Sequence, residues 1–219
     1  MKLTSTHPWV KTVTEARIIQ EQLRTKVITK DCLGKVKYVA GVDIGFEDNY
    51  AISKAAVAVL SFPELELVES AIARMPTAFP YVPGYLSFRE IPAILAVLPQ
   101  LKITPDLILC DGQGLAHPRR LGLACHLGVL LDLPTIGVAK SLFIGKHEEL
   151  PTEKGSWVEL IDKNETIGVV LRSRANVKPI YVSVGHKISL PTAIDYVTNC
   201  LTKYRLPETT RWADKLASH

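Results

Sequence analysis

The stretch VKYVAGVDIGF, residues 36–46, is an apolar run with one acidic residue inside it. Its apolar, β-branched composition predicts a buried strand that ends at Asp43, which has glycines nearby on both sides. Two more strand-like runs follow, KAAVAVLSF (residues 54–62) and LELVESAIARM (residues 65–75), joined by a Pro-Glu turn. The three runs together predict an antiparallel meander.

The elements that flank this meander follow from hydrophobic periodicity and from breaker residues. On the N-terminal side, TVTEARIIQEQLRTKVI (residues 12–28) has apolar side chains at helical spacing. On the C-terminal side we expect a helix at about 87–97, a strand in 105–114, a helix at about 119–131 and a strand in 134–141. Beyond a polar segment, 145–156, we expect strands near 166–171 and 180–184, a helix at 191–204 and a short tail with helical character.

This order of elements predicts an α/β fold with a mixed central sheet, in which the antiparallel meander is joined to parallel strands and helices pack on the faces. A ribonuclease H-like core uses the same order. No repeat, low-complexity linker or shift in composition divides the chain, so residues 1–219 are expected to form a single domain.

The composition sets limits on compartment and partners. The chain is 47% hydrophobic and 22% charged, and its net charge of +4 permits a nucleic-acid partner without requiring one. No apolar run approaches the ~18 residues of a membrane span, and MKLTSTHPWV lacks the apolar core of a signal peptide. The four cysteines are dispersed, and those in apolar runs are expected to be buried in a reducing compartment. We therefore expect a cytoplasmic protein with no membrane partner.

Four carboxylates are candidates for a site, and each also has an ordinary structural explanation. Asp43 could cap a turn at its strand end. Glu90 falls in the first turn of the expected helix, where an acidic side chain interacts favourably with the helix dipole. Asp111 follows a strand in CDGQG, where Asp-Gly is a common turn, although strand ends in open α/β sheets are also where sites form. Asp214, in RWADKLASH, could simply be solvated.

Considered together, these carboxylates point to a metal site. Asp43 and Asp111 should lie side by side if the first and fourth strands are neighbours, and Glu90 can reach the same edge. Carboxylates that close cannot all stay ionised without a cation, and oxygen ligands without a Cys/His cluster favour Mg²⁺ or Mn²⁺. Such a site suits phosphodiester hydrolysis by one metal, or by two roughly 3.5–4 Å apart. Lys140, at the end of TIGVAKS, could hold the phosphate or the nucleophile, or could extend to solvent.

The segment FPYVPGYLSFRE, residues 79–90, fits neither helical nor strand periodicity. Its two prolines fix the backbone on either side of Tyr81-Val82 and remove two N–H donors. The loop leads directly into Glu90. It could be a rigid connection packed on the core, or a stiff wedge beside an active-site carboxylate.

Four segments resemble the endonuclease V family, or deoxyinosine 3′ endonucleases, in length and order: GVDIGF, FPYVPGYLSFRE, CDGQGLAHPRRLGLACHLGV and TIGVAKS. The resemblance extends from about residue 10 to the C-terminal tail. It implies one ribonuclease H-like catalytic domain that repairs DNA containing deoxyinosine, with inosine-containing RNA as a second candidate substrate. It further implies Mg²⁺-dependent hydrolysis of the second phosphodiester bond on the 3′ side of the damaged base. Mn²⁺ is a candidate substitute from the ligand chemistry, and a monomer is favoured, although the sequence does not determine the oligomeric state.

The resemblance also assigns roles to individual residues. Asp43, Glu90 and Asp111 match the catalytic, metal-binding carboxylates of the family, and Lys140 matches its active-site lysine. Asp214 matches a last metal-site position that is His in some members and Asp in others. The strand-separating wedge corresponds to Pro80, Tyr81, Val82 and Pro83, with Val82 in place of the usual Ile. The pocket for the flipped base corresponds to Gly84, Leu86, Gly112, His117, Gly122 and Leu123.

These roles have a physical basis. A base in a duplex must leave the stack before a pocket can bind it, and a rigid aromatic tip can fill the gap. Glycines let the pocket backbone approach the purine edge and leave no room for the amino group of guanine. His117 could stack or hydrogen-bond in the pocket, or could be a structural turn residue. Arg119 and Arg120 are expected to open a helix, where they could meet phosphates or remain solvated.

Two other functions share parts of this pattern. A non-cleaving reader of inosine or branched DNA would need the wedge and the pocket but not the carboxylates. GVDIG and CDGQG also resemble the phosphate loops of sugar kinases and actin-like ATPases, which duplicate the domain to clamp ATP. A chain of 219 residues is too short for two copies.

Overall fold

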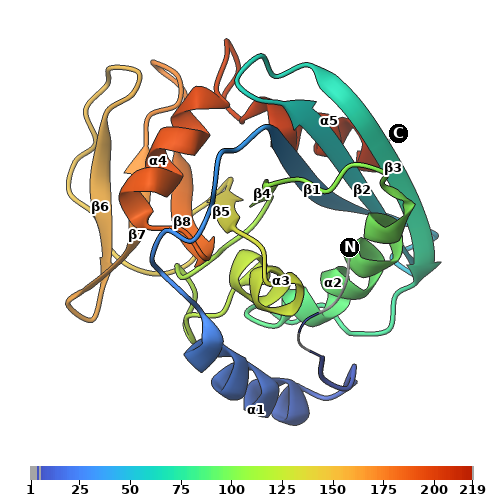
Figure 1. Ribbon diagram of the computed structural model, residues 1–219. Coiled ribbons are helices and arrows are strands. Elements are labelled where there is room, and N and C mark those ends of the chain that lie inside the picture. The colour runs from blue at the N-terminus through green and yellow to red at the C-terminus, as the bar shows by residue number, and fades with distance from the viewer. Residues whose placement is uncertain (1–3, 5, 219) are drawn as a thin grey trace.

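The computed structural model describes residue 4 and residues 6–218, in which five α-helices accompany one sheet of eight strands (Figure 1). The helices are α1 (Val13–Leu23), α2 (Leu86–Val97), α3 (Leu123–Leu131), α4 (Leu190–Asn199) and α5 (Glu208–Ser218). The strands are β1 (Tyr38–Glu47), β2 (Ile52–Ser61), β3 (Leu67–Pro76), β4 (Leu107–Cys110), β5 (Thr135–Ala139), β6 (Trp157–Asp162), β7 (Glu165–Leu171) and β8 (Ile180–His186).

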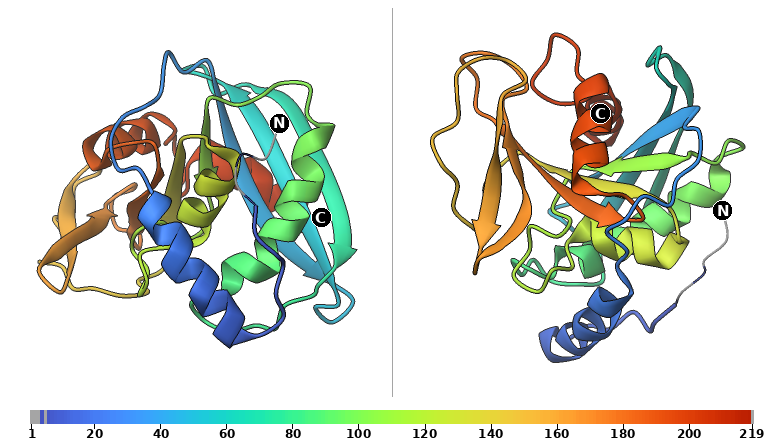
Figure 2. Two further views of the ribbon diagram at one scale, coloured as in Figure 1. Left: turned by 60° about the horizontal axis from the view of Figure 1, so that its bottom comes forward. Right: turned by 60° about the vertical axis from the view of Figure 1, so that its left-hand side comes forward.

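The sheet is mixed, which confirms the predicted fold class. Its strand order is β3-β2-β1-β4-β5-β8-β7-β6. The central strands β1, β4 and β5 are parallel, and the predicted antiparallel meander extends the sheet on one side. Strands β8, β7 and β6 extend it on the other side with antiparallel pairing (Figure 2). Because parallel strands end at the same edge, the carboxyl ends of β1, β4 and β5 meet there.

Strand β1 is longer than predicted. It continues through Asp43 to Glu47, and Asp43 pairs with Ala56 inside the ladder with β2. The prediction that the strand ends at Asp43 is wrong, because Gly45 pairs with Lys54 without breaking that ladder. The parallel pairing of β1 with β4, by contrast, stops at Val42, so Asp43 lies where the neighbouring strand ends.

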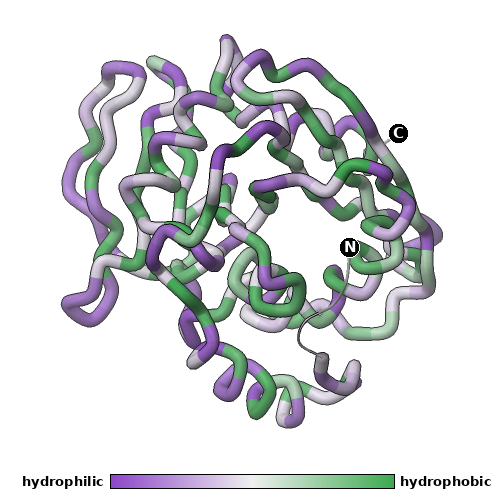
Figure 3. Tube along the Cα trace, viewed as in Figure 1, coloured by the Kyte–Doolittle hydropathy of each residue, from purple (hydrophilic) through white to green (hydrophobic). Residues whose placement is uncertain are grey.

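Helices cover both faces of the sheet, and apolar residues concentrate between them and the strands (Figure 3). Helices α2 and α3 pack on the face that carries Val42, while α4 and α5 pack on the face that carries Val39. Side chains alternate along a strand, so Asp43 lies on the same face as Val39 and Gly41, the face that α5 covers.

Helix α5 approaches β1 closely because two glycines face it. A Cβ on Gly41 would overlap the carbonyl oxygen of Thr209, and a Cβ on Gly45 would overlap that of Ala217. Both oxygens belong to the α5 backbone and cannot move aside as the tip of a side chain could. The two glycines therefore let α5 lie directly on β1, which brings Asp214 towards Asp43.

Several predicted boundaries are wrong. Strand β6 is missing from the predicted elements because it is an edge strand in which only Leu160 is buried, so its apolar signal is weak. The helix expected from Arg119 begins at Leu123, because Arg120 has a left-handed backbone with φ of 55°. Helix α4 ends at Asn199 rather than at 204, and the tail forms α5.

The structure also bears on compartment and on the cysteines. In the described residues, no helix is long and apolar enough to cross a membrane. Cys110 and Cys125, in their apolar runs, are buried as predicted, and so is Cys200, whereas Cys32 is exposed. Residues 1–3 and 5 of the segment predicted to lack a signal peptide lie outside the described residues, as does His219.

The segment before α1 is fixed by a chain of hydrogen bonds that starts in the core. Nδ1 of the buried His126 lies 2.9 Å from the Ser87 hydroxyl, and its Nε2 lies 2.7 Å from Nε2 of His7. His7 in turn bonds the carbonyl of Pro8 through Nδ1. Two neutral rings satisfy this chain if the Ser87 hydroxyl donates to Nδ1 of His126, Nε2–H of His126 donates to Nε2 of His7, and Nδ1–H of His7 donates to the carbonyl of Pro8. Trp9 stacks on His126 at a ring distance of 6.0 Å and covers the pair.

Acidification is expected to weaken the fold through this pair. Burial lowers the pKa of His126 well below its ordinary value of 6.5, and burial also lowers that of His7. Below about pH 6.5 these two histidines bind protons in the unfolded chain that the folded chain excludes, so their contribution to the free energy of unfolding decreases as the pH falls. Asp43 and Glu90, whose pKa values are raised, contribute in the opposite direction, so the effect of the histidines is measured as a difference between variants. His126 alone should account for a loss of about 2 kcal/mol between about pH 7 and about pH 5, measured by denaturant titration.

The matched variants separate titration from packing. His126→Asn should remove the share of this one histidine from the slope of unfolding free energy against pH, while His117, Asp43 and Glu90 keep their own contributions. Ser87→Ala removes the hydroxyl but keeps the imidazole, so it should lower stability similarly at both pH values and keep the slope. An unchanged slope in His126→Asn would contradict the assignment.

Candidate active site

Three carboxylates come together at the carboxyl edge of the parallel strands. Asp43 lies in β1, Asp111 directly follows β4, and Asp214 lies in α5. One carboxylate oxygen from each residue lies within 4.8 Å of the other two. The backbone N–H of Asp111 donates to the carbonyl oxygen of Val42 at 3.2 Å and so extends the β1–β4 ladder by one step. The predicted neighbourhood of Asp43 and Asp111 is thus present.

Lys140 lies between two of these carboxylates. Its ammonium is 2.5 Å from Oδ2 of Asp111 and 2.9 Å from Oδ1 of Asp214. Burial alone would lower the pKa of Lys140, but the carboxylates outweigh it and raise that pKa, so the side chain stays charged. Its position directly after β5 explains the reach, because β5 ends beside β4 at the same edge.

The electrostatics of the cluster favour a bound cation. Burial, followed by the neighbouring charge of Asp111, raises the pKa of Asp43 to about 7. Burial also raises the pKa of Asp111, against the opposing effect of the Lys140 ammonium. A divalent cation would offset both the burial and the mutual repulsion, and carboxylate oxygens without Cys or His are the ligands that hard cations prefer. The residues present therefore fit a metal site.

Glu90 lies near this cluster but, among the described residues, it is not one of the three carboxylates grouped within 4.8 Å. Because α2 begins at Leu86, Glu90 is its fifth residue, so the expectation of a first-turn position is wrong. Burial and then the charges of Asp43 and Asp111 raise its pKa to about 8. Glu90 also lines the adjoining cavity. It is therefore placed to act beside the three aspartates rather than among them.

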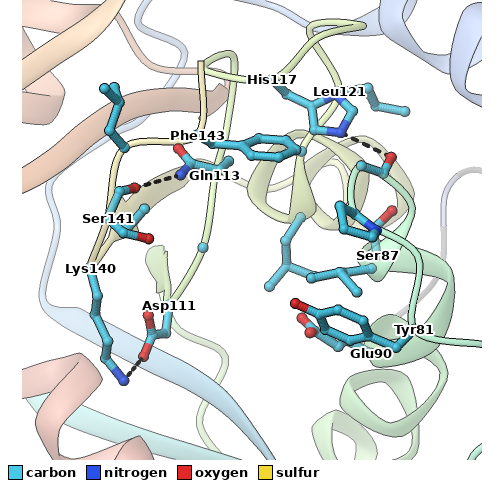
Figure 4. Close-up of a pocket in the computed structure, with 18 residues that line it drawn as sticks. Tyr81, Ser87, Glu90, Asp111, Gln113, His117, Leu121, Lys140, Ser141 and Phe143 are labelled. Carbon is cyan, nitrogen blue, oxygen red and sulfur yellow. Dashed lines mark hydrogen bonds and ion pairs between the residues drawn. The ribbon is translucent and has the colours of Figure 1, made fainter. Parts of the chain in front are cut away.

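A cavity of about 330 Å³ adjoins the carboxylates, and Asp111, Glu90 and Lys140 form part of its wall (Figure 4). This volume is at the small end of the range of about 300–1,000 Å³ that is typical of small-molecule sites. All six residues predicted for the base pocket line it: Gly84, Leu86, Gly112, His117, Gly122 and Leu123. The structure therefore joins the predicted pocket and the predicted catalytic residues in one continuous site.

One carbonyl group fixes the upper wall of this cavity. The Gly84 oxygen accepts hydrogen bonds from Gln20 Nε2 at 2.9 Å, His117 Nε2 at 3.0 Å and an Arg119 guanidinium nitrogen at 2.6 Å. Gly84 itself has a φ of 84°, which a residue with a side chain adopts only with strain. The wall is thus held by three side chains from α1 and from the loop after β4.

His117 is fixed as a neutral ring. Its Nδ1 accepts from the backbone N–H of Arg119 at 3.2 Å, so Nε2 carries the proton that it donates to Gly84. Burial and the Arg119 charge lower its pKa to about 4. Both ring nitrogens are occupied, which leaves the ring face, 5.8 Å from the ring of Phe143, to contact a ligand. Of the three roles left open for His117, hydrogen bonding to a base does not fit this geometry, stacking does, and the bonds to Gly84 and Arg119 also support the role of a structural turn residue.

Arg119 and Arg120 do not form a helix start. The Arg119 guanidinium donates to Gln20 at 2.5 Å and lies 4.2 Å from the Tyr85 ring, and Arg119 is not part of the cavity wall. Arg120 bonds Asp162 at 2.8 Å and Glu165 at 2.7 Å, which ties the β6–β7 turn to the loop that carries His117. Both side chains therefore hold the pocket loop in place.

The proline-bracketed loop stands at the mouth of the cavity. Tyr81 is 69% exposed, and it lines the cavity together with Pro83, whereas Pro80 and Val82 do not. Val82 packs against a core cluster that includes Phe79. The N–H of Tyr85 donates to the carbonyl of Val82 at 3.0 Å and closes a turn. The loop is thus anchored from below, while its aromatic tip is exposed at the mouth of the cavity that it lines (Figure 4).

Arg89 and Gln20, which have no role predicted from the sequence, both support this site. The buried Arg89 donates to the carbonyl of Phe79 at 3.0 Å and lies 4.4 Å from the Phe46 ring, so it connects the loop to the end of β1. Gln20 is fully buried on α1. A polar residue on the apolar stripe of an otherwise amphipathic helix is the signal that could have identified Gln20. Seven further residues that line the cavity were not predicted from the sequence: Ser87, Gln113, Leu121, Ala139, Ser141, Leu142 and Phe143.

The fold and the site define a class of protein. The same fold occurs in Argonaute from A. aeolicus, which superimposes with a TM-score of 0.54 at 18% identity over 86% of this chain and 29% of that chain. The chain thus has a ribonuclease H-like fold, with a cluster of three carboxylates that could hold a metal ion at the edge of its sheet. Residues 21–215 match the family model for endonuclease V. Endonuclease V of Rippkaea orientalis is 71% identical over 219 residues, covering 100% of this chain and 96% of that protein. The chain belongs to the endonuclease V family.

Solved structures of the family agree with this assignment. Endonuclease V from Streptomyces avermitilis superimposes with a TM-score of 0.91 at 45% identity, over 96% of this chain and 93% of that chain. Endonuclease V from Ciona intestinalis, in complex with a 24mer DNA containing an inosine followed by a ribo-adenosine, superimposes with a TM-score of 0.80 at 36% identity, over 94% and 96% of the two chains.

Proposed function

We propose that this protein is a DNA repair endonuclease that recognises deoxyinosine by base flipping and hydrolyses the second phosphodiester bond 3′ to the lesion. One observation carries the proposal: the Asp43–Asp111–Asp214 cluster shares Asp111 with a cavity whose mouth holds a rigid, exposed Tyr81. A site for hydrolysis and a site for an extruded base are thus joined. The inosine-containing DNA bound by the Ciona relative supports the choice of lesion.

We propose Mg²⁺ as the cofactor, held by Asp43, Asp111 and Asp214 with Glu90 beside them, and Mn²⁺ as a substitute. A cation bound there would lower the pKa of a water nucleophile and stabilise charge on the leaving oxygen. The Lys140 ammonium, held between Asp111 and Asp214, would orient the scissile phosphate by direct ion pairing. The raised pKa values of Asp43 and Glu90 support a site that reaches full ionisation together with its cation.

The wall of the cavity would select the base. Gly84, Gly112 and Gly122 line the cavity, so their backbone would face a bound purine, and Leu123 lies 3.3 Å from the place where a Gly112 side chain would project. An added amino group, as in guanine, would meet this tight wall. Deoxyinosine pairs weakly, so it is extruded at lower cost than a normal base. Tyr81 would then occupy the gap left in the stack.

The wider setting follows from the same features. One sheet contains all eight strands of the described residues, between Tyr38 and His186, and helices from both ends of the chain pack beside it, which supports one catalytic domain. Cysteines without disulfide bonds support a cytoplasmic setting. We favour a monomer acting on DNA, with inosine-containing RNA as a second substrate to be tested.

The test is a nicking assay on a duplex with a single deoxyinosine, set against the same duplex with deoxyadenosine at that position. We expect a single nick at the second bond 3′ to deoxyinosine in the presence of Mg²⁺, and no nick with EDTA or with deoxyadenosine. Binding of the deoxyinosine duplex without any nicking in Mg²⁺ or Mn²⁺ would contradict the proposal and would favour a non-cleaving reader. An RNA duplex with inosine tests the second substrate.

A further inference from the structure

A second groove meets the carboxylate cluster from the side of α5. It measures about 450 Å³, and its lining includes Tyr204, Arg211, Asp214 and Lys215. It shares no lining residue with the cavity that contains Asp111. Asp214, whose side chain is 45% exposed, belongs to this groove and to the cluster at once. The carboxylates therefore lie between two hollows: the cavity proposed to bind the base, and a groove for which no ligand has yet been proposed.

The groove has a basic and aromatic surface. The Arg211 guanidinium lies 3.3 Å from the Tyr204 ring centroid and is held there by Glu208 at 2.6 Å. Lys203, next to the groove, lies 5.4 Å from the same Tyr204 ring, and Lys215 lies 5.2 Å from the ring of Trp212. The two acidic groups of the region, Glu208 and Asp214, are each engaged by a cation. Positive charge thus exceeds negative charge along the groove.

Arg205 connects this groove to the catalytic lysine. Its guanidinium donates to the carbonyl of Lys140 at 2.5 Å, to that of Pro179 at 2.8 Å and to that of Lys178 at 2.9 Å. Arg205 therefore joins the loop before α5 to the end of β5, so the groove and Lys140 are parts of one rigid unit.

We propose that this groove binds the part of the cleaved strand that lies 3′ of the cut. This rests on the proposed function, in which the lesion base enters the cavity and the bond two positions to its 3′ side reaches the carboxylates. The strand that continues in the 3′ direction then leaves the cluster on the side away from the cavity, where Asp214 opens into the groove. Lysine and arginine neutralise phosphates there, and the partly exposed Tyr204 ring, which Arg211 covers on one face, can stack a base on its other face.

The test compares two deoxyinosine substrates that differ only on the 3′ side of the cut. One has a long 3′ arm, and the other ends two nucleotides beyond the cut. The variant combines Lys203→Glu with Tyr204→Ala, two changes in side chains that do not touch the carboxylates. We expect KM for the long-arm substrate to rise about 10-fold, from the loss of one phosphate contact and one stacking contact, with less than about a twofold change for the short-arm substrate.

The controls keep the inference separate from the proposed function. Lys163→Glu, an exposed lysine at the β6–β7 turn, should affect both substrates equally. Unchanged nicking of the short-arm substrate by the groove variant shows that it is folded. Equal increases in KM on both substrates, or no increase on either, would overturn the inference while leaving the nicking activity intact. Failure of the unmodified protein to nick either substrate would overturn the proposed function, and the inference with it.

Discussion

Asp111→Asn is expected to abolish nicking of a deoxyinosine duplex while leaving its binding largely intact. Of the three clustered aspartates, only Asp111 also lines the cavity, and its carboxylate forms a short ion pair with the Lys140 ammonium. Asparagine keeps the shape of the side chain but removes the charge that a cation and Lys140 both need. Loss of several kcal/mol of transition-state stabilisation corresponds to a fall in kcat of roughly 1,000-fold or more.

The measurement is single-turnover nicking in Mg²⁺, together with gel-shift affinity for the same duplex. Asp195→Asn is the matched control, because Asp195 is exposed on α4 and its side chain, among the described residues, accepts a hydrogen bond only from Asn199 in its own helix. That variant should nick at the normal rate. Near-normal cutting by Asp111→Asn would remove Asp111 from the metal site, and a parallel loss of binding would show that its charge serves the fold or the pocket instead.

The central part of the fold could be predicted from sequence because its signals are local. The run around Asp43, the two strands after it and the alternation of helices and strands from α2 to β5 all follow from periodicity and breakers. The edge of the sheet formed by the C-terminal half of the chain was harder to predict. Strand β6 buries only Leu160, and its place at the sheet edge is set by pairing with β7 rather than by its own composition.

The carboxylate pair could be predicted for the same reason, because Asp43 and Asp111 follow from the order of the strands. Asp214 could not be placed by such reasoning, since its position depends on α5 lying on Gly41 and Gly45, a contact between segments far apart in the chain. Sequence resemblance supplied Asp214 where physical reasoning from the sequence did not.

Arg119 is a residue for which the sequence pattern suggested a role that the structure does not support. A basic residue near a helix start suggests a phosphate site, but the carbonyl of Gly84 and the side chain of Gln20 bind its guanidinium instead. Both partners lie far from Arg119 in sequence, so no local pattern reveals them. The buried Gln20 is unusual on an apolar helix face, and in the structure it is the partner that explains where Arg119 points.

Tyr81→Ala is expected to weaken binding to a deoxyinosine duplex about 10- to 100-fold, since base–aromatic stacking contributes about 1–3 kcal/mol. Single-stranded DNA with the same lesion needs no gap filled, so its affinity should fall less than about threefold. The reason lies in the loop: Tyr81 is 69% exposed, while Phe79 beneath it is buried and bonded through its carbonyl to Arg89. The tip is therefore presented on a fixed base and enters the stack at little entropic cost.

Fluorescence anisotropy on the duplex and on the single strand measures this difference directly. Trp157→Ala is the matched control, because Trp157 is also exposed, at 48%, but lies on the edge strand β6. It should leave both affinities unchanged. If Tyr81→Ala reduced duplex and single-strand affinity by the same factor, the ring would be a general stacking contact and not a wedge. A selective loss on the duplex is the result that only strand separation explains, because the two substrates carry the same base and differ only in whether it must first leave a stack.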